Sequence, residues 1–292
     1  MSQDQETAVR PVKMRTISTG GAFGVSFGKS KPLALMAGPC VIESREHSLE
    51  LAGKLAAMAK RYKVPYVFKA SFDKANRSSV TSFRGPGIEA GLDILSEVRN
   101  TLGVPIVTDI HEPWQAYEAA KYVDILQIPA FLCRQTDLLI AAGETGCVIN
   151  VKKMQSMAAE DMEHVIAKIE STGNHKILLT ERGASFGYRN LVADMRSLLV
   201  MREFGYPVIF DATHSVQRPG ALGGGSGGDG RWAPALARAA VATGAVDGLF
   251  IETHETPEQA LSDAANSIAL AKLPALWKQL TAIAEVGRKA KF

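Results

Sequence analysis

Short apolar runs alternate with longer amphipathic stretches along most of this chain. The runs span four to six residues and are rich in Val, Ile and Leu, as buried parallel strands are. We predict strands at Leu33–Gly38, Tyr66–Ser71, Ile106–Asp109, Ile125–Ile128, Val148–Lys152, Ile177–Glu181, Val208–Asp211 and Gly248–Glu252. Helical spacing of apolar residues predicts helices at Ser48–Tyr62, Ile88–Leu102, Ala158–Ser171, Leu191–Phe204, Pro234–Thr243 and Pro274–Arg288.

The number of these units indicates the fold class. Eight βα units favour an α/β protein in which the parallel sheet closes into a single (β/α)8 TIM barrel. An open, doubly wound sheet is the rival, but no Gly-x-Gly-x-x-Gly motif follows the first strand. We expect residues 31–292 to form one barrel domain.

The segment before the barrel carries a different pattern. Val12–Ser18 and Gly24–Phe27 flank the turn residues Thr19-Gly20-Gly21, which predicts a short N-terminal β-hairpin within residues 12–30. We expect residues 1–11, which are mostly polar, to be a disordered leader.

Composition excludes several classes of protein. A net charge of +3 without a long Lys/Arg run argues against nucleic-acid binding. Three cysteines do not make a disulfide framework, which favours a reducing compartment. The first ten residues lack a signal peptide's apolar core, and no apolar run reaches the roughly 18–20 residues of a membrane span. We therefore expect a cytoplasmic protein that contacts no membrane.

Polar residues recur at the end of every predicted strand. In a TIM barrel these ends meet at one face, which carries the active site. Five basic residues belong to this set and would converge on one rim: Lys69, Lys74, Arg77, Lys152 and Arg182. Because clustered cations repel, we expect phosphate or carboxylate groups of a substrate between them. Any single lysine could instead extend from a strand end to water.

A possible metal-binding set lies after strands one, seven and eight, which become neighbours when the barrel closes. Cys40, His214, Glu252 and Asp263 combine a thiolate, an imidazole and two carboxylates. That combination suits Zn²⁺ or Fe²⁺, with Mn²⁺ as a further option, rather than Mg²⁺ or Ca²⁺. Alternatively, Cys40 is a buried small residue, and His214 is a core imidazole or a general acid/base.

Other reactive residue types have simpler interpretations. Cys133 and Cys147 are expected to be structural, and His47 to be solvated on its helix. His254 is expected either behind the site or at the surface. The glycine-rich stretch Gly220–Gly230 is either a lid over the site or an ordinary loop.

Several long motifs resemble one family. The chain is similar to the 3-deoxy-D-manno-octulosonate 8-phosphate synthases from about Leu33 to its last helix. The motifs are LMAGPCVIES (Leu35–Ser44), FKASFDKANRSS (Phe68–Ser79), TDIHEP (Thr108–Pro113), LQIPAFLCRQTDL (Leu126–Leu138), INVKK (Ile149–Lys153), TERGASFGYRNLVADMR (Thr180–Arg196), FDATHSVQ (Phe210–Gln217) and FIETH (Phe250–His254).

This resemblance implies a homotetrameric (β/α)8 enzyme. The implied reaction joins phosphoenolpyruvate, D-arabinose 5-phosphate and water into an eight-carbon sugar acid phosphate for lipopolysaccharide, with release of phosphate. Cys40 in AGPC implies the metal-dependent branch, since the metal-independent branch has Asn there. Asn76 is typical of the arabinose 5-phosphate enzymes, whereas a related erythrose 4-phosphate class carries a Lys-Pro-Arg-Thr type segment.

The resemblance also implies roles for individual residues. Lys69, Lys74, Gln127, Lys152 and Arg182 would bind phosphoenolpyruvate, and Asn76, Arg77 and Ser78 the sugar phosphate, with Arg77 on its phosphate. Asp109 would support substrate hydroxyls or a lysine. The implied catalytic residues are Lys69, Lys74, Asp109 and His214, the further substrate-binding residues include Ser71, and the metal ligands are Cys40, His214, Glu252 and Asp263.

Two other hypotheses stay open at this stage. A Schiff-base aldolase with Lys152 as nucleophile would also use a barrel. A non-catalytic barrel would bind both ligands without releasing phosphate.

Overall fold

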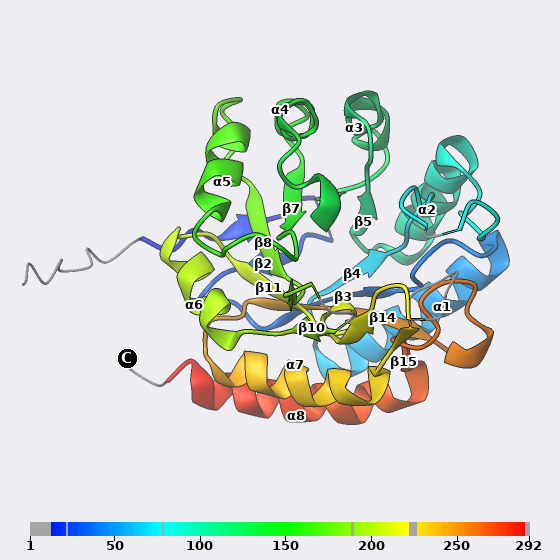
Figure 1. Ribbon diagram of the computed structural model, residues 1–292. Coiled ribbons are helices and arrows are strands. Elements are labelled where there is room, and N and C mark those ends of the chain that lie inside the picture. Colours follow the sequence, from blue (N-terminus) through cyan, green and yellow to red (C-terminus); the bar gives the residue numbers. More distant parts are fainter. Residues whose placement is uncertain (1–12, 22, 78, 188–189, 222–226, 290–292) are drawn as a thin grey trace, which may run out of the picture.

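The computed structural model describes residues 13–289 except 22, 78, 188–189 and 222–226. Eight parallel strands form a closed barrel, and the helices surround it (Figure 1). The strands are β3 (Ala34–Gly38), β4 (Tyr66–Lys69), β5 (Ile106–Asp109), β6 (Ile125–Ile128), β7 (Val148–Lys152), β8 (Ile177–Glu181), β11 (Val208–Asp211) and β14 (Gly248–His254). Pairing of β11 with β14 and of β14 with β3 closes the sheet, which confirms the predicted (β/α)8 barrel.

The helical layer follows the predicted order with two additions. Its helices are α1 (Arg45–Tyr62), α2 (Ile88–Leu102), α3 (Pro113–Ala119), α4 (Thr136–Glu144), α5 (Met162–Glu170), α6 (Met195–Glu203), α7 (Ala233–Ala242) and α8 (Leu273–Gly287). The pattern did not predict α3, which has only seven residues, or α4, whose apolar residues extend around most of the helix. Both cover the barrel beside α5, as Figure 1 shows.

Local capping explains one shifted boundary. A helix was predicted from Leu191, but Leu191–Val192 form strand β10, which pairs with β9 (Ala184–Ser185). The Asp194 side chain accepts a hydrogen bond from the Arg196 amide and starts α6 one residue later.

The barrel interior explains where the polar residues point. An apolar cluster, separate from the larger core under the helices, contains a residue of every barrel strand. Because side chains alternate between the two faces of a strand, the residue two positions further on also points inside. The interior residues are Met36, Val67, Val107, Ile125, Val148, Leu178, Ile209 and Phe250. Most of the residues that follow these by two positions are polar, and they therefore point into the mouth of the barrel. They are Lys69, Asp109, Gln127, Asn150, Thr180, Asp211 and Glu252.

The N-terminal hairpin packs against the opposite end of this interior. Strands β1 (Ile17–Ser18) and β2 (Ser26–Phe27) pair antiparallel, in a shorter hairpin than the pattern predicted. Phe27 is fully buried and belongs to the interior cluster together with Ile17. The hairpin therefore covers the amino end of the barrel. The leader, residues 1–11, lies outside the described part of the chain.

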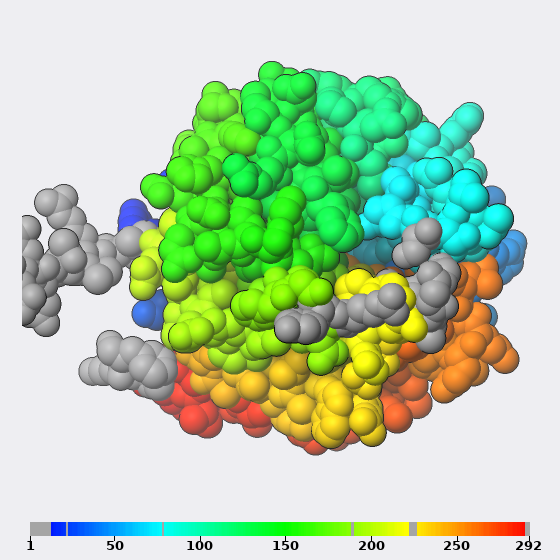
Figure 2. Space-filling view, in the orientation of Figure 1, coloured from blue at the N-terminus to red at the C-terminus, as the bar shows by residue number. Residues whose placement is uncertain are grey.

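The loops at the carboxyl end of the barrel come from distant parts of the sequence. Figure 2 shows the segment after β4 in cyan, above the segment after β14 in orange. Of the predicted lid, Gly220–Gly230, residues 222–226 lie outside the described part, and Gly227–Gly228 form the short strand β13. Among the described helices, none has the length and apolar character needed to cross a bilayer.

Candidate active site

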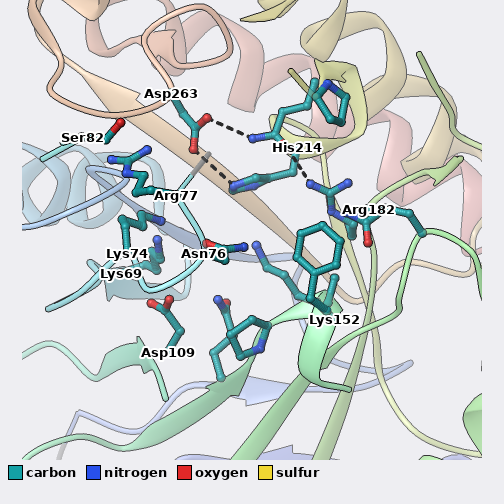
Figure 3. A pocket seen from close by; sticks show the side chains of 17 residues that line it. Lys69, Lys74, Asn76, Arg77, Ser82, Asp109, Lys152, Arg182, His214 and Asp263 are labelled. Carbon is teal, nitrogen blue, oxygen red and sulfur yellow. Dashed lines mark hydrogen bonds and ion pairs between the residues drawn. The ribbon is translucent and has the colours of Figure 1, made fainter. Parts of the chain in front are cut away.

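A cavity of about 250 Å³ opens at the carboxyl end of the barrel. Figure 3 shows its side chains arriving from opposite sides, with Lys69, Lys74 and Asp109 facing His214 and Asp263. The predicted site residues that line it are Lys69, Lys74, Asn76, Arg77, Asp109, Gln127, Lys152, Arg182, His214 and Asp263.

The remaining predicted residues do not line the cavity. Cys40, Ser71 and Glu252 are buried in its immediate surroundings, where they contact residues of the wall. Ser78 lies outside the described residues.

Three lysines approach the cavity floor in contact with acidic residues. Lys69 Nζ donates to Cys40 O at 2.8 Å and to Ser71 Oγ at 3.1 Å, and it lies 3.3 Å from Glu252 Oε1. Lys74 Nζ is 3.9 Å from the same carboxylate oxygen. The protein itself therefore partly neutralises this part of the cluster.

Lys152 occupies a different environment. Its Nζ donates to Asp211 Oδ2 at 2.6 Å and sits 3.7 Å from the centre of the Phe250 ring. Burial lowers the pKa of Lys152, although the Asp211 charge opposes this effect. For Lys74, burial also acts to lower the pKa, but the negative charges of Cys40 and Glu252 outweigh it and raise the pKa.

Two guanidinium groups have nitrogens without a partner among the described residues. Arg182 Nη2 donates to Gln217 Oε1 at 2.5 Å, whereas its Nη1 is buried and unpaired. Arg77 Nε donates to Phe83 O at 3.0 Å, and its Nη2 is likewise buried and unpaired. A buried charged donor without an acceptor is unfavourable by several kcal/mol. Both groups are therefore suited to receive anionic oxygens inside the cavity.

Asp109 lies on the cavity wall between a hydroxyl group and an imidazole. Its carboxylate accepts from the Ser71 hydroxyl, and His111 Nε2 lies 3.2 Å from Asp109 Oδ2. Burial would raise the pKa of Asp109, but the hydrogen bond from His111 and the charge of Lys74 hold it well below its ordinary value. Asp109 is therefore an anion at neutral pH.

The predicted metal ligands come together beside the cavity. Cys40 Sγ is 3.1 Å from Asp263 Oδ2, and His214 Nε2 is 3.5 Å from Glu252 Oε1 and 3.9 Å from Asp263 Oδ2. Donor atoms around a tetrahedral ion lie roughly 3–4 Å apart, given bonds of about 2.0–2.3 Å. The donor atoms of Cys40, Glu252 and Asp263 all lie within 4.8 Å of one another, and His214 Nε2 approaches the two carboxylates of this group.

Burial and charge give a second test of the metal assignment. Burial, together with the nearby Glu252 charge, raises the pKa of Cys40 well above that of a free thiol. Glu252 Oε2 is buried and has no hydrogen-bond partner among the described residues. A divalent cation would stabilise the thiolate and offset the buried carboxylates, so the donor set fits such an ion.

Sequence reasoning missed two residues that organise this region. Gln217 accepts from Arg182 and donates to Asp263 Oδ1 at 3.0 Å, so it joins the basic and acidic halves of the cavity. Ser262 Oγ lies 2.8 Å from Cys40 Sγ. Gln217 does follow a barrel strand, but no feature of the sequence distinguished Ser262.

A comparison with known proteins places the chain in a family. The family model described as "DAHP synthetase I family" matches residues 6–286. The chain belongs to the DAHP synthetase I family. Within this family, its motifs had indicated the octulosonate phosphate synthases.

Several relatives of this DAHP synthetase I chain are named 2-dehydro-3-deoxyphosphooctonate aldolase. The protein of Geobacter metallireducens is 58% identical over 259 residues, which cover 89% of this chain and 95% of the relative. That of Citrifermentans bemidjiense is 58% identical over 269 residues, covering 92% and 97%. That of Desulfatibacillum aliphaticivorans is 55% identical over 268 residues, with the same coverage. These matches confirm the resemblance inferred from the motifs.

Proposed function

We propose that this protein condenses phosphoenolpyruvate with D-arabinose 5-phosphate and water, and releases inorganic phosphate. The product is 3-deoxy-D-manno-octulosonate 8-phosphate, the acid that the relatives' name describes. The observation that carries the proposal is a pair of buried guanidinium nitrogens, of Arg77 and Arg182, which face one cavity and have no partner in the described part of the chain. Two such groups suit two anionic substrates bound side by side.

The two substrates are assigned to opposite parts of the cavity. Phosphoenolpyruvate, with a phosphate and a carboxylate, takes the deeper part with Lys69, Lys74, Gln127, Lys152 and Arg182. The sugar phosphate takes the part lined by Asn76 and Arg77, which follow β4 in the chain. Ser78, next along the chain, is assigned to the same substrate, whose phosphate group is assigned to Arg77.

The proposed chemistry forms one C–C bond and breaks one C–O bond. The methylene carbon of phosphoenolpyruvate attacks the aldehyde, and water adds to the adjacent carbon, which then loses phosphate by C–O cleavage. The lysines balance the phosphate and carboxylate charges, and the nearby Asp109 and His111 hold a proton in a defined place. Alignment of two substrates in one cavity supplies up to about 7–11 kcal/mol.

A divalent ion is part of this proposal. Cys40, His214, Glu252 and Asp263 would hold Zn²⁺, Fe²⁺ or Mn²⁺. When bound, the ion would either polarise the aldehyde or lower the pKa of a water molecule. On the other side of its ring, His214 Nδ1 lies 2.8 Å from Asp211 Oδ2.

A phosphate-release assay tests the proposed reaction. The purified protein is given phosphoenolpyruvate with either arabinose 5-phosphate or erythrose 4-phosphate, with and without chelator. We expect rapid release with the five-carbon sugar phosphate, slow release with the four-carbon one, and loss of activity in chelator. No release with either sugar would refute the synthase and leave the Schiff-base aldolase and the binding barrel.

One observation favours a second candidate. A lysine of lowered pKa, such as Lys152, is the usual nucleophile of Schiff-base aldolases. Borohydride added during turnover separates the two reactions. A reduced adduct on Lys152 would support the aldolase mechanism, and an unmodified lysine supports the synthase.

The assembly and location of the enzyme are further parts of the proposal. We infer a homotetramer, as the family resemblance implies, and its mass by light scattering is the test. We also infer that the protein works in the cytoplasm, because a thiolate ligand such as Cys40 needs a reducing environment. The sugar acid phosphate would there serve lipopolysaccharide synthesis.

A further inference from the structure

A second cluster of histidines and glutamates lies beyond the cavity wall, between α1 and the segment after β14. The rings of His47 and His254 lie against each other, with centres 4.7 Å apart and planes tilted by 37°. Glu43 Oε2 is 3.6 Å from His254 Nε2 and 4.0 Å from His47 Nδ1. Glu255 Oε2 is 3.2 Å from His47 Nε2. His47 is thus partly buried, with a side-chain exposure of 20%, and is less solvated than its helical pattern alone predicts.

The spacing of this cluster resembles that of a metal site, but its hydrogen bonds do not. Donor atoms of Glu43, His47 and His254 lie within 4.8 Å of one another. However, the Thr256 amide donates to His254 Nδ1 at 2.9 Å, so that nitrogen carries the lone pair. The proton of a neutral imidazole is then on Nε2, the atom that faces Glu43. A metal ligand would need its lone pair there.

Glu43 instead connects two segments of the active site. Its Oε1 accepts a hydrogen bond from the Leu261 amide at 2.9 Å. The next two residues after Leu261 are Ser262 and Asp263, and both contact the Cys40 thiol. Glu43 itself follows Cys40 by three positions. One carboxylate therefore spans the two loops that carry a thiolate and a carboxylate ligand.

The backbone at Asp263 shows why such support is needed. Asp263 has φ of 50°, in the left-handed region that residues other than glycine rarely adopt. This conformation costs about 1–2 kcal/mol, so surrounding contacts must hold it in place. The Leu261 hydrogen bond lies two residues before this position.

We propose that Glu43 is a positioning residue that holds Asp263 against Cys40 through the Leu261 amide, with His254 Nε2 facing its other carboxylate oxygen. Glu43 does not line the cavity in which the two substrates are proposed to bind. The inference rests on the proposed metal-dependent function, because it concerns the geometry of two proposed ligands.

Two substitutions of Glu43 distinguish its hydrogen bond to the Leu261 amide from the effect of its negative charge. Glu43→Ala removes the acceptor for Leu261. Glu43→Gln removes the charge equally but keeps a carbonyl oxygen that can accept the same hydrogen bond. Glu255→Gln is the matched control, since it removes a charge from the same cluster without touching the Leu261 amide.

Cobalt affinity is the first readout, measured through the thiolate-to-cobalt absorption band. We expect Glu43→Ala to weaken Co²⁺ binding about 10–100-fold, as loss of outer-shell support typically does, and the two Gln variants to stay within about threefold. Equal weakening in Glu43→Ala and Glu43→Gln would overturn positioning in favour of a charge effect. A wild type that binds no Co²⁺ would overturn the inference, while phosphate release in chelator would still establish the synthase.

Alkylation of Cys40 in metal-free protein is the second readout. Iodoacetamide modification is followed by peptide mass spectrometry, so that Cys40 is separated from Cys133 and Cys147. Because the Asp263 loop covers the thiol, Glu43→Ala should raise its labelling rate at least tenfold, and Glu43→Gln should not. Unchanged labelling of Cys40 in Glu43→Ala would contradict the proposal whatever the metal content.

Discussion

The Cys40 thiol donates to Asp263 Oδ2 at 3.1 Å, although 223 positions separate the two residues. Strand pairing explains this proximity, because β3 and β14 lie side by side with Gly38 opposite Glu252. The loop after each strand then starts from the same place on the barrel rim. Barrel closure alone therefore brings the first and last quarters of the chain into one site.

Removal of metal should abolish activity. Cys40, Glu252 and Asp263 bring a buried thiol and two carboxylates together beside His214, and a divalent cation would offset their charge. We expect EDTA to abolish phosphate release, and Zn²⁺, Mn²⁺ or Fe²⁺ to restore it. Full turnover by protein shown to be metal-free by elemental analysis would refute the Cys40 assignment.

Cys40→Asn tests the same residue in another way. The resemblance implies that a metal-independent branch uses Asn at this position, so the variant should keep weak activity that chelator does not affect. Cys40→Ala, which offers no hydrogen-bonding group, is the control and should be inactive. Metal-stimulated activity in Cys40→Ala would mean that the thiol is not a ligand.

The two arginines should affect different substrates. We expect Arg77→Ala to raise the KM for arabinose 5-phosphate about 10–100-fold, equivalent to a charged hydrogen bond of about 1.5–3 kcal/mol, with little change for phosphoenolpyruvate. Arg182→Ala should show the reverse. Arg84→Ala is the control, because Arg84 pairs with Asp73 at the surface and does not line the cavity. Equal losses for both substrates in Arg77→Ala would count against the assignment.

Much of this site was predictable from the sequence because strand ends meet by topology. The positions and number of the strands were enough to predict that Lys69, Asp109 and Lys152 lie at the carboxyl end of the barrel. The partners of these residues were not predictable. Nothing in the sequence indicates that Lys152 pairs with Asp211, since that contact depends on side-chain conformations across the barrel interior.

The histidine cluster shows a different limit of sequence reasoning. His47 lies on a polar face of α1, and the helical pattern alone predicts that it is solvated. It is covered by His254 and Glu255, which arrive from the far end of the chain. Tertiary contacts of this kind leave no periodic signal.

Stability should depend on pH through Glu170. The Tyr206 hydroxyl donates to this carboxylate and lowers the pKa of Glu170 in the folded protein. The charged Glu170 therefore stabilises the folded protein fully at pH values above its unfolded pKa, near 4.3. This stabilisation is lost as the pH falls through the lower pKa of the folded state. We expect Tyr206→Phe to cost about 1 kcal/mol at pH 7 and less at pH 3.

Urea unfolding of both proteins at the two pH values measures this difference. Tyr62→Phe is the control, because the Tyr62 hydroxyl makes no hydrogen bond within the described residues. An equal loss at both pH values would show that the Tyr206 hydroxyl acts independently of the Glu170 charge.

Two glycines should respond oppositely to alanine. A Cβ at Gly53, inside α1, meets nothing within 4 Å, so Gly53→Ala should stabilise the protein by about 0.5–1 kcal/mol. A Cβ at Gly38 would lie 2.0 Å from the Lys69 carbonyl oxygen, so Gly38→Ala should destabilise by about 1–3 kcal/mol. Thermal unfolding midpoints of both variants provide the measurement. A stabilised Gly38→Ala would show that β3 and β4 can separate at this point.

In most barrel strands, a polar residue that points into the mouth of the barrel follows an interior apolar residue by two positions. This fixed spacing restricts which insertions and deletions such a protein can accept during evolution. One residue inserted between Val67 and Lys69 would turn the lysine outward, toward the helices, and bring an apolar neighbour into the mouth of the barrel. Gains and losses of residues are therefore tolerated in the connections beyond the strands but not within them. New specificities in this scaffold should arise from altered loop lengths, while the spacing inside each strand stays fixed.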